Sequence, residues 1–214
     1  CIANLNSRDY IARRNPLKST NPFNKNDGIK LKQYNQYHTL EKNMIIKKIN
    51  QFLKEDLPTG DITTESTIVD DTTIEAKIIA MENMIFSGEQ IIPHCFGNTV
   101  DVDINRKDGE QIWPHAIIGR IKGSAKLILS RERIMLNLIQ RLCGIATNTK
   151  IYVDLAKPFN VKILDTRKTT PGIREFEKYA VKCGGGYNHR LNLSTGILIK
   201  DNHIQAAGSI KKAL

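Results

Sequence analysis

Two short apolar runs, each followed directly by polar and basic residues, constrain this chain more than any other feature of its sequence. The runs are residues 161–164 and 197–199. Between them, the apolar side chains of residues 172–182 recur at helical spacing, and Gly184 follows as a helix end. A strand, a helix and a second strand in this order predict a parallel α/β unit. Because the loops after the strands form the active face of α/β barrels, we expect the two polar clusters to share one pocket.

The polar clusters are rich in groups that bind anions. Arginine offers a planar fork for a carboxylate or phosphate, lysine offers a compact charge, and the glycines at 184–186 let a backbone approach a ligand closely. Each piece alone is more typical of a solvated turn, a flexible connection or a structural histidine. Their combined order and spacing predict a pocket for a small, highly anionic substrate. The candidate residues in this segment are Thr166, Arg167, Lys168, His189, Arg190 and Lys200.

The first half of the chain has the pattern of a smaller α/β domain. Apolar residues on one face predict a helix over residues 45–57, and short alternating or apolar runs predict strands. Residues 88–96 have a helical pattern that Pro93 interrupts. A long helical pattern then passes through residues 134–142 into the parallel unit. The strands are predicted at residues 74–80, 84–87, 100–104 and 116–121.

Composition argues against several other classes of protein. The formal net charge is +10, but half of that excess falls on residues 1–43, and aromatic residues make up only 6%. The chain therefore lacks an evident stacking surface for nucleic acid, and a nucleic-acid-binding basic arm is the weaker alternative. No apolar run approaches the roughly 20 residues that cross a bilayer. The cysteines show no metal-ligand spacing and are expected to be reduced thiols of a cytoplasmic protein. They are Cys1, Cys95, Cys143 and Cys183.

Residues 165–203 closely resemble the signature of the quinolinate phosphoribosyltransferases, also called carboxylating nicotinate-nucleotide pyrophosphorylases. Three further stretches resemble motifs of the same family: residues 55–64, the Ser-Arg-Glu-Arg of residues 130–133, and residues 140–147. The resemblance covers about residues 44–214. A related family associated with molybdenum transport shares the fold and is the weaker candidate.

The resemblance implies a fold of two domains. An N-terminal α/β sandwich is expected over residues 44–136, followed by the first part of an open TIM-type α/β barrel over residues 137–214. Residues 1–43 match nothing in the family and are expected to form a disordered extension. Only two barrel strands can be recognised, and a βα unit takes roughly 30 residues. The carboxyl-terminal part of the barrel, with its acidic residues near the ribose and metal, is therefore expected to be absent, as in a truncated reading frame or fragment.

The resemblance also implies an activity. The family joins quinolinate to 5-phosphoribosyl 1-diphosphate and releases pyrophosphate and carbon dioxide, which gives nicotinate mononucleotide for NAD biosynthesis. Mg²⁺ is expected, bound mainly through the substrate diphosphate, and so is a homodimer with shared active sites. An inactive fragment or a non-catalytic subunit of the same family is the alternative.

The same resemblance assigns roles to individual residues. Four residues are expected to bind the carboxylates of quinolinate, and two lysines are expected to face the sugar diphosphate. Thr166 lies beside them, and Arg133 is expected to reach into the pocket of a neighbouring subunit. Arg174 and Lys178 are expected on the surface of their helix. The carboxylate-binding residues are Arg133, Arg167, His189 and Arg190, and the catalytic, diphosphate-facing residues are Lys168 and Lys200.

Overall fold

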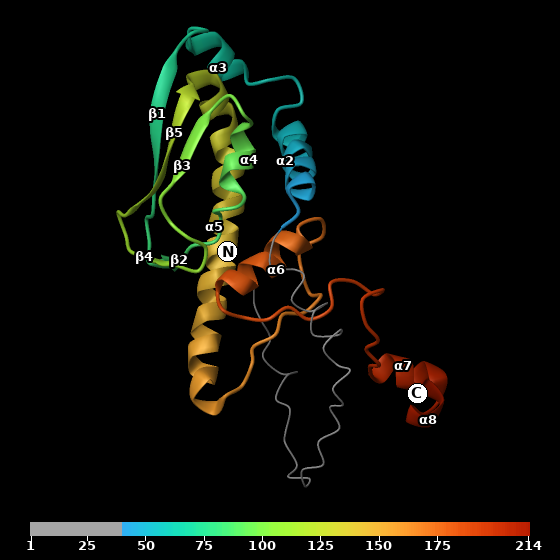
Figure 1. Ribbon diagram of the computed structural model, residues 1–214. Coiled ribbons are helices and arrows are strands. Elements are labelled where there is room, and N and C mark those ends of the chain that lie inside the picture. Colours follow the sequence, from blue (N-terminus) through green and yellow to red (C-terminus); the bar gives the residue numbers. More distant parts are fainter. Residues whose placement is uncertain (1–39) are drawn as a thin grey trace.

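The computed structural model describes residues 40–214 and has a three-stranded sheet beside one long helix, α5 (Ala125–Ala156) (Figure 1). The predicted extension falls mainly on residues 1–39, which lie outside the described residues. Leu40 is buried in the core, and helix α2 (Lys42–Asp56) follows it directly. The predicted domain boundary at residue 44 therefore falls inside helix α2.

The antiparallel sheet is amphipathic, as its alternating sequence predicts. Its strands are β1 (Thr73–Ile79), β3 (Asp101–Ile104) and β5 (Ile117–Ser124), with β5 in the centre. Ile78 and Ile121 are buried in the core, whereas the charged side chains that alternate with the core residues are exposed. The three strands predicted for this region are confirmed, with slightly shifted ends.

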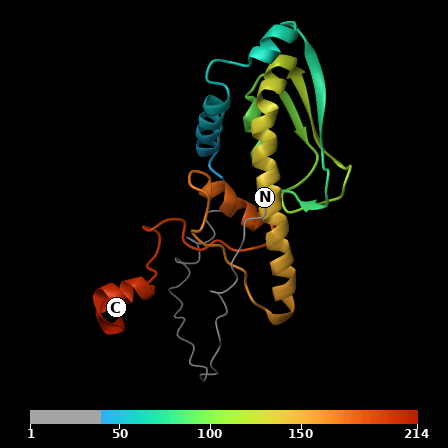
Figure 2. The same ribbon diagram turned by 180° about the vertical axis from the view of Figure 1, so that it is seen from behind.

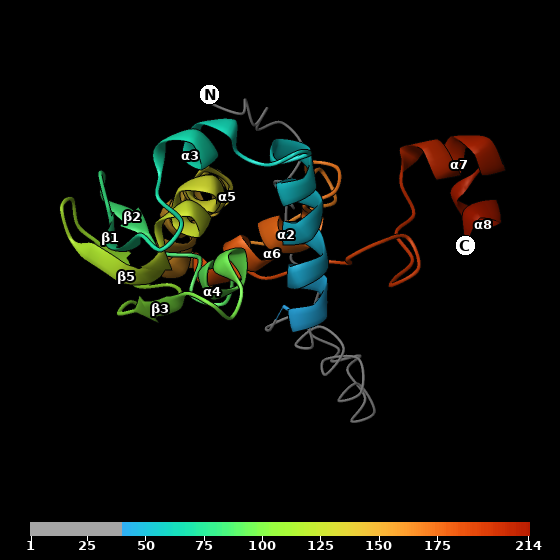
Figure 3. The ribbon, with the colours of Figure 1, turned by 90° about the horizontal axis from the view of Figure 1, so that it is seen from above.

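Smaller elements complete the core of this half. Helix α4 (Ile92–Phe96) contacts both α5 and α2, and α3 (Ile62–Thr67) contacts α5 (Figure 3). Pro93 stands in the first turn of α4, where its missing N–H costs no helical hydrogen bond, so the helix forms but is shorter than predicted. Strands β2 (Met84–Ile85) and β4 (Gln111–Ile112) form a second, two-stranded sheet.

Helix α5 joins the two parts of the chain. Its N-terminus is capped by Ser124, whose side chain accepts a hydrogen bond from the N–H of Leu127 over 3.4 Å. Its 32 residues extend about 48 Å at 1.5 Å per residue. It contacts β5, β2 and α4 of the first part and α6 (Arg174–Cys183) of the second. The predicted division between residues 136 and 137 falls inside this continuous helix and stays a prediction.

Neither strand predicted for the second part forms as a full strand. The run 161–164 contributes Leu164 alone, which makes a single parallel bridge with Tyr187. Residues 197–199 form no strand, and Ile197 is 95% exposed. A strand needs a hydrogen-bonded neighbour along its edge, and no described residue supplies one for residues 197–199.

The last two helices lie apart from the rest of the described chain. Helices α7 (Asp201–Ala207) and α8 (Ile210–Ala213) contact each other and stand away from the sheet and α5 in both views (Figure 1 and Figure 2). A short 3₁₀ turn, η2 (Lys157–Phe159), follows α5 and leads into the second part. None of the helices in residues 40–214 combines the length and the apolar character of a membrane span.

Gly119 in the central strand tests the close packing of the sheet. A Cβ at this position would lie 2.5 Å from the Asp103 carbonyl oxygen, which belongs to the neighbouring backbone. We expect Gly119→Ala to lower the free energy of unfolding by about 1–3 kcal/mol, measured by urea denaturation. The control is Gly144→Ala in α5, where a Cβ meets nothing within 4 Å and should raise stability by about 0.5–1 kcal/mol. Equal effects of the two substitutions would contradict this packing.

Candidate anion-binding site

The parallel bridge at Tyr187 brings two polar segments together. The Tyr187 N–H donates to the Ile163 carbonyl over 2.9 Å, and the Asp165 N–H donates to the Tyr187 carbonyl over 2.9 Å. Because paired parallel segments run in the same direction, the residues that follow them leave at the same edge. Residues 166–168 and 188–190 therefore follow the bridge on the same side.

This pairing corrects the predicted one. The prediction took residues 197–199 as the second strand, whereas the structure pairs Leu164 with Tyr187. Tyr187 is one residue placed directly after the glycine triplet, so no apolar run marks it in the sequence. The prediction that the second polar cluster is the one at Lys200 is wrong, because His189 and Arg190 are the residues that follow the segment paired with Leu164.

A buried carboxylate, Asp165, ties the two segments together. Its Oδ1 accepts the backbone N–H of His189 over 2.8 Å, and its Oδ2 accepts the side-chain amide of Asn188 over 2.6 Å. The Nζ of Lys178 lies 2.5 Å from Oδ1, and both charged side chains are only 5% exposed. Asn188 also donates to the Lys178 carbonyl over 2.8 Å. One carboxylate thus gathers donors from helix α6 and from the segment that carries His189.

Two residues of α6 that were predicted to lie on its surface have structural roles instead. Lys178 is 4% exposed and pairs with Asp165, a partner 13 positions away that helical periodicity cannot indicate. Arg174 is half-buried, and its Nε donates to the Thr169 hydroxyl over 2.9 Å. An Nη1 of Arg174 donates to the Leu191 carbonyl over 3.4 Å. Arg174 therefore bridges the loops that follow the two paired segments.

A second buried carboxylate, Glu177, holds the first of these loops against α5. Its Oε2 accepts the N–H of Thr170 over 3.0 Å. Its Oε1 accepts Nε and Nη2 of Arg141 over 2.8 and 2.5 Å. An Nη2 of Arg141 also contacts the Thr170 hydroxyl at 2.5 Å. The loop that carries Thr169 and Thr170, called the threonine loop below, is therefore held by hydrogen bonds from both α5 and α6.

Arg167 and Arg190, which with Thr166, Lys168 and His189 form the cluster that follows the bridge, each carry a buried donor without a partner in the described part of the chain. Arg190 is 9% exposed, and its Nη1 donates to the Gly196 carbonyl over 2.9 Å. The Nε atoms of Arg167 and Arg190 are shielded from solvent and have no hydrogen-bond partner among the described residues. Buried donors are normally satisfied, and anionic oxygens are strong acceptors for guanidinium groups. Lys168, next to Arg167, is exposed. These cations suit an anionic ligand.

The glycine triplet serves packing rather than close approach to a ligand, which corrects its predicted role. A Cβ on Gly184 would lie 2.4 Å from the Ala146 carbonyl oxygen of α5, and a Cβ on Gly186 would lie 2.7 Å from Val181. The three glycine N–H groups donate to carbonyls at the end of α6 over 2.9 to 3.0 Å. Gly185 has a φ of +84°, which favours glycine. The triplet therefore closes α6 against α5.

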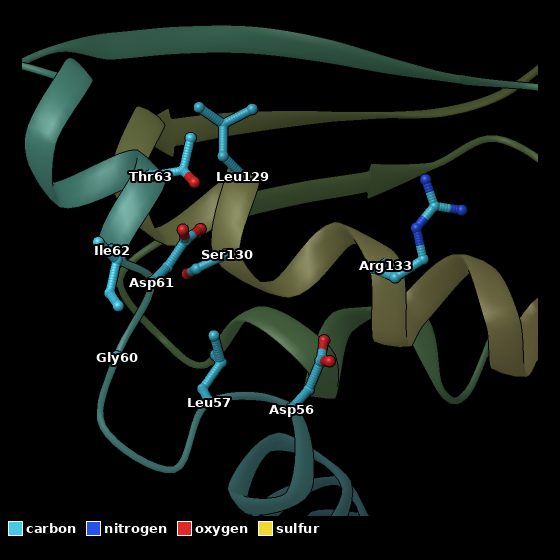
Figure 4. A pocket seen from close by; sticks show the side chains of 9 residues that line it. All are labelled: Asp56, Leu57, Gly60, Asp61, Ile62, Thr63, Leu129, Ser130 and Arg133. Atoms are coloured by element: carbon cyan, nitrogen blue, oxygen red, sulfur yellow. The ribbon is translucent and has the colours of Figure 1, made fainter.

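The structure does not bring Arg133 into the cluster. Arg133 is exposed on α5, eight residues or about 12 Å before Arg141 along the helix axis. It lines one end of an open hollow of about 340 Å³ between α2, α3 and α5, and its guanidinium points away from Asp61 and Ser130 (Figure 4). The hydrogen bond from the Thr64 hydroxyl, joined by one from its N–H, lowers the pKa of the Asp61 carboxyl. Asp61 therefore serves as the N-cap of α3.

Lys200 also lies outside the cluster in the described chain. It is exposed and directly precedes α7, one of the two helices that stand apart. Its backbone N–H donates to Nδ1 of His203 over 3.0 Å, so these two residues cap a helix end. The described chain therefore brings together Thr166, Arg167, Lys168, His189 and Arg190, and leaves Arg133 and Lys200 elsewhere.

Buried side chains fasten α6 to the first part of the chain. The Tyr179 hydroxyl donates to the Asp108 carboxylate, whose other oxygen accepts the N–H of Gly88 over 2.7 Å. Burial raises the pKa of the Tyr179 phenol. Burial also raises the pKa of the Cys143 thiol to about 11 and that of the Cys183 thiol to about 12. The three cysteines in the described part of the chain are free thiols, as predicted.

Two protein-family models match the chain. The N-terminal domain of quinolinate phosphoribosyl transferase matches residues 61–143. The C-terminal domain of the same transferase matches residues 145–214. The two matches cover most of the described residues in the order expected for one protein.

Individual relatives agree with the family models. A probable carboxylating nicotinate-nucleotide pyrophosphorylase of Bacillus subtilis (strain 168) is 48% identical over 170 residues, which are 78% of this chain and 58% of that protein. The chloroplastic carboxylating nicotinate-nucleotide pyrophosphorylase of Arabidopsis thaliana is 43% identical over 73% of this chain and 45% of its own length. The chain therefore spans about half the length of these curated relatives.

Solved structures agree with both the sequence and the fold. The nicotinate-nucleotide pyrophosphorylase from Francisella tularensis superposes with a TM-score of 0.77 at 38% identity, over 83% of this chain and 64% of that one. The α/β fold and the cluster of cations thus have the character of a phosphoribosyltransferase. More specifically, the chain belongs to the quinolinate phosphoribosyltransferase family, and the predicted family and fold class are confirmed.

Glu177→Gln tests whether the threonine loop depends on a buried charge. We expect a loss of about 1–3 kcal/mol of unfolding free energy, because a neutral amide weakens the bonds to Arg141 and to the Thr170 N–H. The measurement is thermal and urea denaturation. Glu175→Gln is the matched control on the same helix, outside this set of hydrogen bonds. Equal stabilities of the two variants would show that the Glu177 contacts contribute little.

The raised thiol pKa values predict slow alkylation of the native protein. At pH 8 a thiol with a pKa of about 11 is thiolate in only about one molecule in a thousand, and the thiolate is the reactive form. In a Cys1→Ser variant, we expect the thiols of Cys95, Cys143 and Cys183 to react with iodoacetamide far more slowly when folded than in urea. Comparable rates in the two states, followed by mass spectrometry, would contradict their burial.

Proposed function

We propose that this protein transfers the phosphoribosyl group of 5-phosphoribosyl 1-diphosphate to quinolinate and decarboxylates the product to nicotinate mononucleotide, a step of NAD biosynthesis. Family membership supports the reaction. The observation that carries the proposal is the grouping of Arg167, His189 and Arg190 at one edge, with two buried guanidinium donors that have no partner among residues 40–214. The proposal places the protein in the cytoplasm, whereas the relative from Arabidopsis thaliana is named chloroplastic.

The side chains of the cluster act by binding and orientation. Quinolinate carries two carboxylates, and the guanidinium forks of Arg167 and Arg190 can each bind one through paired N–H donors. His189 belongs to the second segment, where its backbone N–H is bonded to Asp165, and its imidazole can donate to a carboxylate oxygen. Lys168 is exposed at the same edge and supplies a point charge for the diphosphate of the sugar substrate. Bound in this way, the pyridine nitrogen is held for attack on the anomeric carbon, so catalysis rests on positioning and electrostatics.

The proposal includes Mg²⁺, bound mainly through oxygens of the substrate diphosphate. Among residues 40–214 no three His, Cys, Asp or Glu side chains gather as a metal site, so these residues fit a metal that arrives on substrate oxygens better than one held by the protein. When bound, the ion would neutralise the leaving pyrophosphate. The lysine at 168 would add to that neutralisation.

The proposal also has to account for Arg133 and Lys200, two predicted site residues that lie outside the cluster. Both lie away from the cluster in one chain, and both are exposed. In the proposed homodimer with shared sites, Arg133 serves the pocket of the other subunit, whereas Lys200 keeps its assignment to the sugar diphosphate beside Lys168. Their separation also favours the second candidate, a non-catalytic member of the family. Formation of nicotinate mononucleotide from the two substrates, followed by chromatography, distinguishes the two: product favours the enzyme, and its absence favours the non-catalytic member.

Arg167→Lys tests the carboxylate-binding assignment. Lysine keeps the charge but cannot reproduce the two-pronged geometry, so we expect quinolinate affinity to fall at least tenfold in calorimetric titration. The control is Arg120→Lys on the outer face of the sheet, where Arg120 pairs with Glu75 at 2.6 Å. That variant should bind as the wild type does. Unchanged affinity of the Arg167 variant would refute the assignment.

A further inference from the structure

We propose that Asp165 is a positioning residue that sets the relative orientation of Arg167 and Arg190, with Lys178 as its counter-ion. The inference deepens the proposed function and rests on it, because the oriented groups are those assigned to quinolinate. Asp165 itself has side-chain contacts to protein groups and is 5% exposed in its side chain, so its influence on a ligand would pass through the residues it holds.

The place of Asp165 in the chain is the first argument. It stands two residues before Arg167, and its carboxylate accepts the N–H of His189, the residue directly before Arg190. The same oxygen lies 2.5 Å from the Lys178 ammonium, which also reaches the His189 carbonyl over 3.4 Å. Both backbone groups of His189 are therefore bound by one ion pair. The direction in which Arg190 leaves the bridge depends on that pair.

The side chain of Asn188 adds a further contact to the Asp165–Lys178 pair, and we call these three residues the clamp. Its amide nitrogen donates to Asp165 over 2.6 Å and to the Lys178 carbonyl over 2.8 Å, and the residue is 5% exposed. Three successive residues of the second segment are thus restrained: Tyr187 by the bridge, Asn188 by its side chain and His189 by its backbone. Such restraint favours a site whose donors must keep a fixed separation.

The chemistry of the pair points to orientation rather than stability. A buried ion pair costs desolvation, and apolar residues of similar volume often stabilise a fold equally well or better. An apolar pair at 165 and 178 could fill the same space between α6 and the bridge. It would leave the His189 N–H without its acceptor and the Asn188 amide with the Lys178 carbonyl alone, so the segment before Arg190 would lose its fixed direction. The ion pair therefore does something that packing alone cannot do.

The experiment separates orientation from stability with two variants of Asp165 and the single variant Lys178→Met. Asp165→Asn keeps the shape but sets an amide nitrogen against the donors of Lys178 or Asn188. The double variant Asp165→Leu/Lys178→Met removes both charges and keeps the space filled. We expect quinolinate affinity to fall at least tenfold in both variants. The melting temperature of the double variant should stay closer to that of the wild type than does that of Lys178→Met alone. Amide hydrogen exchange over residues 187–191 should become faster in both Asp165 variants.

The controls distinguish a failure of the positioning role of Asp165 from a failure of the proposed function. Asp103→Asn, on the exposed face of the sheet, should leave affinity and exchange unchanged. If the wild type binds no quinolinate, the proposed function fails, and the exchange data alone judge the clamp: unchanged exchange in the Asp165 variants overturns it. If the wild type binds but Asp165→Asn binds equally well, the positioning role fails while the function stands. Recovery of affinity together with stability in the double variant would reduce Asp165 to a structural residue.

Discussion

Helix α5 is the constraint on which the rest of the structure depends, because both parts of the chain pack on the same continuous helix. Ile128 and Leu142 are buried on its core faces, and the hydroxyl of Thr147 accepts the N–H of Ile85 from β2 over 2.8 Å. The glycine triplet at the end of α6 fits directly against Ala146. A helix fixes the angle between successive side chains. The sheet and the segments joined by the Leu164–Tyr187 bridge therefore have a fixed orientation relative to each other about the axis of α5. A second tie, from Tyr179 to Asp108, supports the same arrangement.

The site owes its order to buried charges more than to its loops. Asp165 and Glu177 each accept a backbone N–H from a different loop, and each is paired with a cation, Lys178 or Arg141. Within each pair, the carboxylate and the cation neutralise each other's charge. The positive charge offered to a ligand therefore comes from the cations that remain outside them, chiefly Arg167, Lys168 and Arg190. In this arrangement the buried ion pairs orient the loops, and the cations outside them bind the ligand. This would explain why so many charged residues occur in so short a segment.

This division of labour agrees with the proposed chemistry. Two carboxylates and a diphosphate can be held only where several cations converge, and repulsion among those cations must be offset by the surrounding structure. Helix α6 supplies that support through its buried polar face, which carries Glu177 and Lys178. The proposed shared site would add Arg133 from another subunit, so the cluster of one chain would be one portion of the complete pocket.

The sequence by itself determined a great deal about this protein. Alternation placed the strands of the first sheet, helical spacing placed α2, α5 and α6, and the long motifs identified the family, because local periodicity and residue order are written along the chain. The same motifs supplied the candidate residues Thr166, Arg167, Lys168, His189 and Arg190. The second polar cluster was placed after the wrong strand, residues 197–199, and the assignment of these residues to a ligand stays a prediction.

Only the tertiary structure decided which partners those residues meet. The one-residue bridge at Tyr187 has no apolar run to mark it, and the pairing of Asp165 with Lys178 joins positions whose separation matches neither a helix turn nor a strand alternation. The tight contact of Gly184 with α5 likewise depends on a neighbour far along the chain. Such contacts arise from how elements pack in space. Burial then determines whether a charge lies in solvent, as Lys168 does, or becomes part of the framework, as Lys178 does.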